Sequence, residues 1–175
     1  METEVKIEVP SLAPFRQRLK QLGAICAGRV DEDNVFFDHD ETLRAREESL
    51  RLRRDQNVRL TWKGPTEYRK GVVRRDEIEI HVDNFETTWA ILERLGFGAT
   101  DRLAKKRETW NLPGAVVALD ELAFGCFVEI EGSSDAIRDI ALKLELNPAD
   151  GIAYSYRKLQ ADRRPSSPKN IAEPK

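Results

Sequence analysis

Residues 2–9 alternate between charged and uncharged side chains, and this alternation constrains the fold more than any other feature. Successive side chains of an extended strand point to opposite faces. One face of such a strand would carry only charged groups, and the other would carry Thr3 and three aliphatic residues. The segment therefore predicts a strand of a sheet that is covered on its apolar face and polar on the other.

The same alternation recurs along the chain with the sign of the charge changed. Extended segments are expected at residues 24–38, 50–54, 58–63, 74–82, 103–110, 115–120 and 126–131. Helices are expected at residues 12–22, 84–95, 134–144 and 154–161, from their apolar spacing and end signals. These segments predict an α+β fold with about eight strands, mostly antiparallel, and a sheet of this size usually curls or closes.

Length and composition limit the classes of protein to consider. We expect one domain over residues 1–162 and a disordered tail over residues 163–175, which are rich in proline and serine. The net charge is only −2 although 34 % of residues are charged, so the basic excess of a nucleic-acid-binding domain is absent. Charge begins at the second residue and no apolar run approaches a membrane span, so we expect no signal peptide, no membrane association and a cytoplasmic location.

The charged faces differ in sign from strand to strand. Basic residues dominate 50–54, 58–63 and 103–110, acidic ones dominate the first strand and the last two, and residues 74–82 are mixed. One interpretation is an ordinary antiparallel sheet with a solvated face and cross-strand ion pairs, which alternation alone favours. The other is a charged barrel interior that binds a polyphosphate, because Arg and Lys bind phosphate oxygens and clustered carboxylates bind divalent metals. The division of charge by strand favours the second interpretation.

A series of short motifs follows in a fixed order. The opening Glu2-x-Glu4-x-Lys6 resembles the ExExK signature of the CYTH superfamily, which contains class IV adenylyl cyclases and thiamine or inorganic triphosphatases. Residues 34–38 resemble its N-x-Tyr-Phe-Asp stretch, with Phe36 in place of the tyrosine. Seven further segments resemble motifs of the same family: ALRIRR at 49–54, LTxKGP at 60–65, RxExE at 75–79, KxR at 105–107, LD at 119–120, FxEIE at 127–131 and SY at 155–156. The resemblance covers residues 2 to about 159.

The resemblance implies a fold and a site. The fold would be an eight-stranded antiparallel closed barrel, a triphosphate tunnel, with helices packed on the outside. The metal ligands for Mg²⁺ or Mn²⁺ would be Glu2, Glu4, Asp120, Glu129 and Glu131. The phosphate-binding residues would be Lys6, Arg51, Arg53, Lys63, Lys105 and Arg107, with Arg59, Arg75, Glu77 and Glu79 as direct or supporting members. Among these, Lys6, Arg53, Lys105 and Glu129 are the expected catalytic residues.

The resemblance also implies a metal-dependent enzyme that acts on a small-molecule triphosphate. A class IV adenylate cyclase, which converts ATP to cyclic AMP and pyrophosphate, is the first expectation. A triphosphatase that hydrolyses tripolyphosphate, thiamine triphosphate or a nucleoside triphosphate is the alternative, because the same residues would serve both reactions. A non-catalytic polyphosphate-binding module is the third hypothesis, and a homodimer is compatible with the resemblance.

Overall fold

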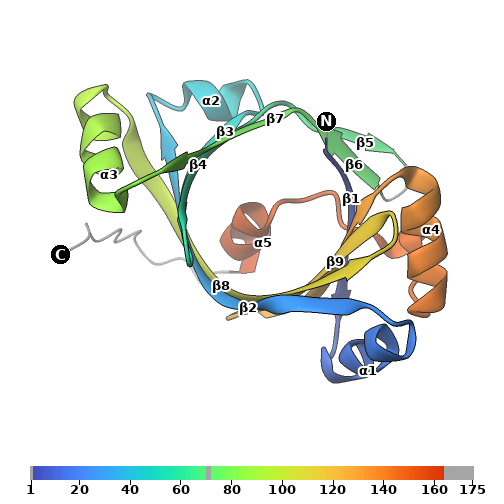
Figure 1. Cartoon of the computed structure of the whole chain (residues 1–175). Coiled ribbons are helices and arrows are strands. Elements are labelled where there is room, and N and C mark those ends of the chain that lie inside the picture. Colours follow the sequence, from blue (N-terminus) through green and yellow to red (C-terminus); the bar gives the residue numbers. More distant parts are fainter. Residues whose placement is uncertain (1, 70–71, 164–175) are drawn as a thin grey trace. The chain divides into compact units, whose positions relative to one another are not determined.

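The computed structural model describes residues 2–69 and 72–163 (Figure 1). These residues form two compact units: the first comprises residues 2–31, 66–69, 72–75 and 105–154, and the second comprises residues 32–65, 76–104 and 155–163. Two long strands, β2 (Ile25–Asp38) and β8 (Gly98–Leu112), contribute residues to both units.

The strands belong to one ten-stranded sheet, and the strand pairings are antiparallel. Besides β2 and β8 they are β1 (Glu2–Val9), β3 (Ser49–Arg54), β4 (Val58–Lys63), β5 (Glu67–Arg69), β6 (Val72–Arg75), β7 (Glu77–Val82), β9 (Ala115–Leu122) and β10 (Gly125–Gly132). Their order is β5-β6-β1-β10-β9-β8-β2-β3-β4-β7. The α+β class and the antiparallel pairing are thus confirmed.

The expected eight-stranded closed barrel is wrong in the number of strands and in closure. The order runs from β5 to β7, with no ladder joining these two strands in the described part of the chain. The segment 74–82 is two strands, since β6 pairs with β1 before Asp76 and β7 pairs with β4 after it. The alternation of side chains stays the same when a strand changes partner, so the sequence pattern does not show the break. Strand β5 has only three residues, too few for a periodic signal.

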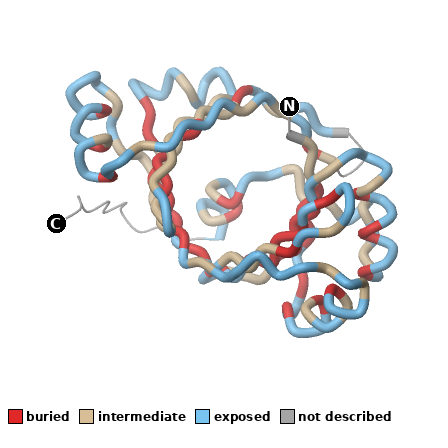
Figure 2. Tube along the Cα trace, in the orientation of Figure 1, coloured by how far each residue is buried: buried red, intermediate tan, exposed pale blue. Residues whose placement is uncertain are grey.

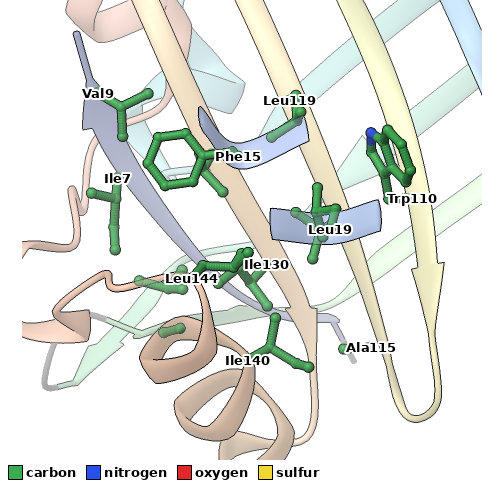
Figure 3. Packing of buried hydrophobic residues seen from close by; sticks show 14 of the residues in the cluster. Ile7, Val9, Phe15, Leu19, Trp110, Ala115, Leu119, Ile130, Ile140 and Leu144 are labelled. Carbon is green, nitrogen blue, oxygen red and sulfur yellow. The ribbon is translucent and has the colours of Figure 1, made fainter. Parts of the chain in front are cut away.

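The core of the first unit lies on the apolar face of β1, β9 and β10 (Figure 3). Helix α1 (Ala13–Gln21) contributes Phe15 and Leu19 to it, and helix α4 (Ser134–Lys143) contributes Ile137 and Ile140. Ser133 caps α4, because its hydroxyl accepts a hydrogen bond from the N–H of Ala136. The apolar set of the opening strand is buried here, which leaves its charged set on the opposite face.

The second unit has a smaller core beneath helix α3 (Phe85–Arg94). Asn84 caps this helix, and its side chain accepts a 2.7 Å hydrogen bond from the N–H of Thr87. Trp89 packs edge-to-face on Phe37 of β2, with the ring centroids 5.1 Å apart. The remaining core residues are Val35, Leu52, Phe85 and Leu92. In Figure 2 the buried positions of both units recur along the strands among more exposed ones, as the sequence alternation predicts.

Three shorter helical segments complete the described chain: α2 (Thr42–Ala45), the 3₁₀ helix η1 (Pro148–Asp150) and α5 (Tyr156–Arg163). Asp38 holds the start of α2, since its buried carboxylate accepts hydrogen bonds from the N–H groups of Leu43 and Arg44. No helix of the described residues is long and apolar enough to cross a membrane. Most of the expected tail lies outside the described residues.

Candidate functional site

In the first unit, the charged faces of β1 and β10 meet at Lys6 and Glu129. The two residues are cross-strand partners, and the Lys6 Nζ lies 3.3 Å from the Glu129 Oε1. Both side chains are at least nine-tenths buried. The Lys6 ammonium also donates to the carbonyl oxygen of Tyr154 at 3.5 Å. Lys6 is thus held between a neighbouring strand and the segment that leads to α5.

Strands β8 and β9 extend this network. Arg107 faces Asp120 in register and binds it through two parallel hydrogen bonds of 2.7 and 2.6 Å. Lys105 donates to the same carboxylate at 3.0 Å, and Arg107 also donates to Glu129. Asp120 is fully buried. Paired guanidinium–carboxylate contacts of this kind are strong and directional, so this part of the site is held rigidly.

Glu129 carries its negative charge in spite of its burial. Burial by itself raises the pKa of a carboxyl group. The charges of Arg107, Lys6 and Lys105 more than offset that effect, so the pKa of Glu129 lies well below its ordinary value of 4.5. Lys6, Lys105 and Arg107 therefore form one charged network with Asp120 and Glu129.

The other expected metal ligands lie at the edge of this face. Glu4 of β1 and Glu131 of β10 are directly opposite each other. Carboxylate oxygens suit Mg²⁺ or Mn²⁺, so this pair is compatible with a metal ion beside it. The described residues contain no group of three close side chains of the metal-binding types. The side chain of Glu2 lies outside the description, and the metal site stays a prediction.

In the second unit, the charged face is built by β3, β4 and β7. Thr61 of β4 pairs with Glu79 of β7 in register, and its hydroxyl donates to that carboxylate at 2.7 Å. Lys63 pairs with Glu77 in the same way, at 2.6 Å. Arg51 lies beside Thr61, with an Nη2–Oγ1 distance of 3.4 Å, and 3.9 Å from Glu79. Glu77 and Glu79 thus support the basic residues of the neighbouring strands.

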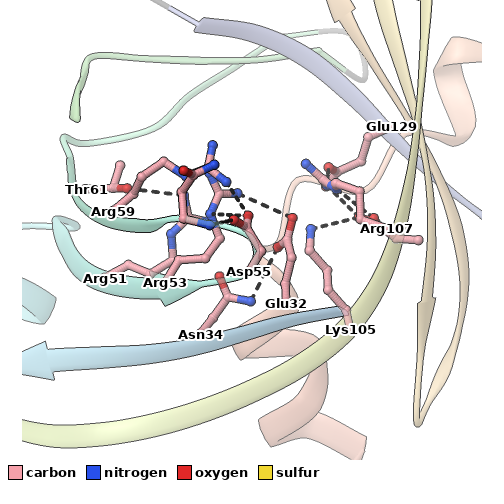
Figure 4. Close-up of polar contacts among 12 residues, drawn as sticks. Glu32, Asn34, Arg51, Arg53, Asp55, Arg59, Thr61, Lys105, Arg107 and Glu129 are labelled. Carbon is pink, nitrogen blue, oxygen red and sulfur yellow. Dashed lines mark hydrogen bonds and ion pairs between the residues drawn. The ribbon is translucent and has the colours of Figure 1, made fainter. Parts of the chain in front are cut away.

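Arg53 and Arg59 form the centre of this second face (Figure 4). Arg53 lies 3.4 Å from Glu32 and 3.5 Å from Glu79, and Arg59 binds Asp55. The Nε atoms of Arg53 and Arg59 are buried and have no hydrogen-bond partner among the described residues. A buried donor without an acceptor is costly, so these two groups are suited to bind an anion that has several oxygens.

The structure thus groups the sequence-predicted residues by unit. The first unit brings together Lys6, Lys105, Arg107, Asp120 and Glu129, and the second brings together Arg51, Arg53, Arg59 and Glu79. Lys63 and Glu77 contact each other in the second unit. Arg75 lies on β6 in the first unit, and its backbone pairs with that of Glu2. The roles of these residues in binding and catalysis stay predictions.

Sequence reasoning missed three polar residues of the second face: Glu32, Asn34 and Asp55. Glu32 and Asn34 are buried on β2, and the Asn34 amide donates to Glu32 at 3.4 Å. Their alternation with the core residues Val35 and Phe37 was a usable signal, since even-numbered positions of β2 share the charged face. Asp55 lies in the turn between β3 and β4, where no periodicity applies, so only the structure could identify it.

The sequence profile of the CYTH domain matches residues 1–149. The chain belongs to the CYTH domain family. A relative from Methanocaldococcus jannaschii, named as a candidate adenylate cyclase, is 28 % identical over 142 residues, which cover 79 % of this chain and 81 % of the relative. The match to the CYTH domain profile confirms the family that the ordered motifs predict.

Solved structures show the same fold. One from Vibrio parahaemolyticus, also named as a candidate adenylate cyclase, has a TM-score of 0.82 at 22 % identity and covers 91 % of this chain and 97 % of its own. Another is from Hippeastrum, with a TM-score of 0.67 at 19 % identity and coverages of 93 % and 95 %. That protein is described as a candidate adenylyl cyclase with a dominant triphosphatase activity.

Proposed function

We propose that this CYTH protein is a divalent-metal-dependent enzyme that acts on a small-molecule triphosphate. One observation carries the proposal: Arg53 and Arg59 are cross-strand partners on one face, and each keeps a buried Nε–H without a hydrogen-bond acceptor in the described chain. A chain of linked phosphates supplies many charged oxygens to such donors, and arginine binds them in planar, paired geometry. Lys6, Lys105 and Arg107 would add further cationic contacts, and neutralisation of phosphate charge is the main source of catalysis in this chemistry.

Adenylate cyclase activity is the first candidate, and names of relatives support it. In that reaction the ribose 3′-oxygen of ATP forms a bond to the α-phosphorus. The bond from that phosphorus to the bridging oxygen breaks, pyrophosphate leaves, and the 3′-hydroxyl proton is lost to solvent or a nearby base. The basic residues of this chain would hold the phosphates and stabilise the charge that develops on the leaving group.

Triphosphatase activity is the second candidate. The Hippeastrum protein, which is described as having a dominant triphosphatase activity, has the same fold. In this reaction water attacks a terminal phosphorus and orthophosphate leaves, with the same cations stabilising the transition state. Tripolyphosphate, thiamine triphosphate and nucleoside triphosphates are the substrates to compare.

We also propose Mg²⁺ or Mn²⁺ as the metal, bound near the opposed carboxylates Glu4 and Glu131, with Glu2, Asp120 and Glu129 as the other oxygen donors. A metal bound there would polarise phosphate oxygens. Asp120 and Glu129 are already bound by Lys105, Arg107 and Lys6 in this structure. These contacts orient both carboxylates, and the cations beside Glu129 keep that group ionised, as a hard cation requires of its ligands.

The deciding experiment is product analysis of the purified protein with Mg²⁺ or Mn²⁺. ATP, thiamine triphosphate and tripolyphosphate are offered in parallel, and Glu129→Gln protein purified in the same way serves as the control for contaminating enzymes. Cyclic AMP with pyrophosphate identifies a cyclase. Orthophosphate without cyclic AMP identifies a triphosphatase. If no substrate is turned over, the enzyme proposal fails, and binding of tripolyphosphate would then indicate a binding module.

A further inference from the structure

The β3–β4 hairpin places two positive charges directly opposite each other. Arg53 of β3 and Arg59 of β4 are cross-strand partners on the same face. Their side chains are only 10 % and 22 % exposed, so water screens the repulsion between them poorly. Like charges at such positions destabilise a sheet unless an anion lies close to both.

Asp55 supplies that anion from within the hairpin itself. It lies in the turn that joins β3 to β4, and its side chain is 3 % exposed. Its Oδ2 accepts a hydrogen bond from Arg59 and lies 3.8 Å from the Nε of Arg53. Its Oδ1 accepts a 2.9 Å hydrogen bond from the N–H of Asn57. The backbone of the turn therefore fixes the carboxylate that touches both guanidinium groups.

The two other carboxylates near these arginines differ from Asp55. Glu32 contacts Arg53 and is buried on β2. Glu79 approaches both arginines, at 3.5 and 3.9 Å, but its side chain is 26 % exposed. Asp55 is thus the buried carboxylate that Arg53 and Arg59 share, and Glu79 is the one that an entering anion can reach and replace.

We propose that Asp55 is a positioning residue that orients Arg53 and Arg59 for phosphate binding. The inference rests on the proposed function, because it takes a polyphosphate as the ligand of the two arginines. With Asp55 in place, the guanidinium groups lie side by side in a fixed orientation before the ligand arrives. Preorganised donors lose less freedom on binding and therefore bind more tightly.

The direction in which neutralising Asp55 changes the affinity for polyphosphate distinguishes this role from a simple charge effect. If Asp55 acted only as an anion that competes with phosphate, its neutralisation would make the face more positive and tighten anion binding. A positioning role predicts weaker binding instead, because the two repelling guanidinium groups lose their common partner. Asp55→Glu extends the test, since it keeps the charge and moves the carboxylate by one methylene group.

The experiment measures tripolyphosphate binding by calorimetry in the presence of EDTA, which prevents metal-dependent turnover. We expect Asp55→Asn and Asp55→Glu each to raise the Kd about tenfold, which corresponds to about 1.4 kcal/mol. Gln56→Ala, an exposed change in the same turn, should leave the Kd unchanged. Wild-type affinity in Asp55→Glu, or tighter binding by Asp55→Asn, overturns the proposal.

A second measurement does not depend on the ligand. A double-mutant cycle of Asp55→Asn with Arg59→Gln, read by urea unfolding, should show clear coupling, and the double variant should be more stable than Asp55→Asn alone. Additive effects of the two changes overturn the positioning role. If wild-type protein binds tripolyphosphate neither with EDTA nor with Mg²⁺ and turns over none of the three substrates, the proposed function fails, whereas the link between Asp55 and the arginines is still decided by the cycle.

Discussion

Asp120 in the first unit and Arg53 in the second differ in how tightly they pair with groups of opposite charge. In the first unit, Asp120 is fully buried and makes contacts of 2.6–3.0 Å with Lys105 and Arg107, which come from a neighbouring strand. In the second unit, Arg53 has contacts of 3.4–3.8 Å with three carboxylates, and its Nε has no hydrogen bond to a described residue. The contacts of Asp120 are thus short and direct, whereas Arg53 keeps a buried donor that a ligand can use.

From this difference we infer that the two charged faces have different roles in the protein. Short, buried and paired contacts fix the positions of groups but are costly to rearrange. Longer contacts with unused donors can be exchanged for phosphate oxygens at lower cost. We therefore expect substitutions in the first unit to affect turnover and stability, and those in the second unit to affect mainly the affinity for substrate.

The largest effect is expected for Glu129→Gln. Loss of this carboxylate removes a proposed metal ligand and the partner of Lys6 and Arg107, so metal-dependent kcat should fall about a thousandfold. Steady-state kinetics give the loss, and circular dichroism checks that the fold is intact. Glu131→Gln, at the exposed edge of the same face, should cause a smaller loss. If the two variants lose the same fraction of kcat, the assignment of Glu129 to the centre of the site is wrong.

Asp120→Asn tests the tight pairing directly. The change leaves Lys105 and Arg107 buried without their common anion, so the free energy of unfolding should fall by about 3 kcal/mol. Urea unfolding measures it. The matched control is Asp139→Asn, whose exposed ion pair with Lys143 should contribute no more than about 0.5 kcal/mol. If Asp120→Asn leaves the free energy of unfolding unchanged, the view that this network holds the first unit rigid is wrong.

Arg53→Gln tests the looser face. Loss of the guanidinium should raise the KM for a triphosphate about ten- to a hundredfold, with a smaller change in kcat, because hydrogen bonds to charged groups are worth about 1.5–3 kcal/mol. Arg54→Gln is the control, since Arg54 lies on the opposite face of the same strand over the ring of Phe85. A loss confined to kcat would place Arg53 among the residues that act in the chemical step.

The smallest effect concerns pH. Because the pKa of Glu129 is lowered in the folded protein, the ionised group contributes stability above its unfolded pKa, near 4.5. That contribution is lost as pH falls below this value and through the folded pKa. Urea unfolding between about pH 5 and about pH 3 should therefore show a shallower loss of stability in Glu129→Gln than in wild-type protein. Parallel curves would mean that the folded charge network does not lower this pKa.

The two-faced strands were predictable from the sequence because side-chain alternation is a local property. Val5 and Ile7 are buried in the first core, and Lys6 lies on the charged face, as the pattern of β1 predicts. The helix capped by Asn84 was predictable for the same reason, since a cap and its helix are neighbours in sequence. The ordered motifs predicted the CYTH family, and the sequence profile confirms it.

The change of partner at Asp76 required the tertiary structure, because pairing joins residues that are distant in sequence. The same holds for Asp55, whose position in a turn has no periodic signal and whose importance comes from its contacts with Arg53 and Arg59. The sequence by itself therefore determined which side chains share a face, because the two-residue period of a strand decides that locally. The tertiary structure decided which strands are neighbours and which charges meet, because register and turns bring distant residues together.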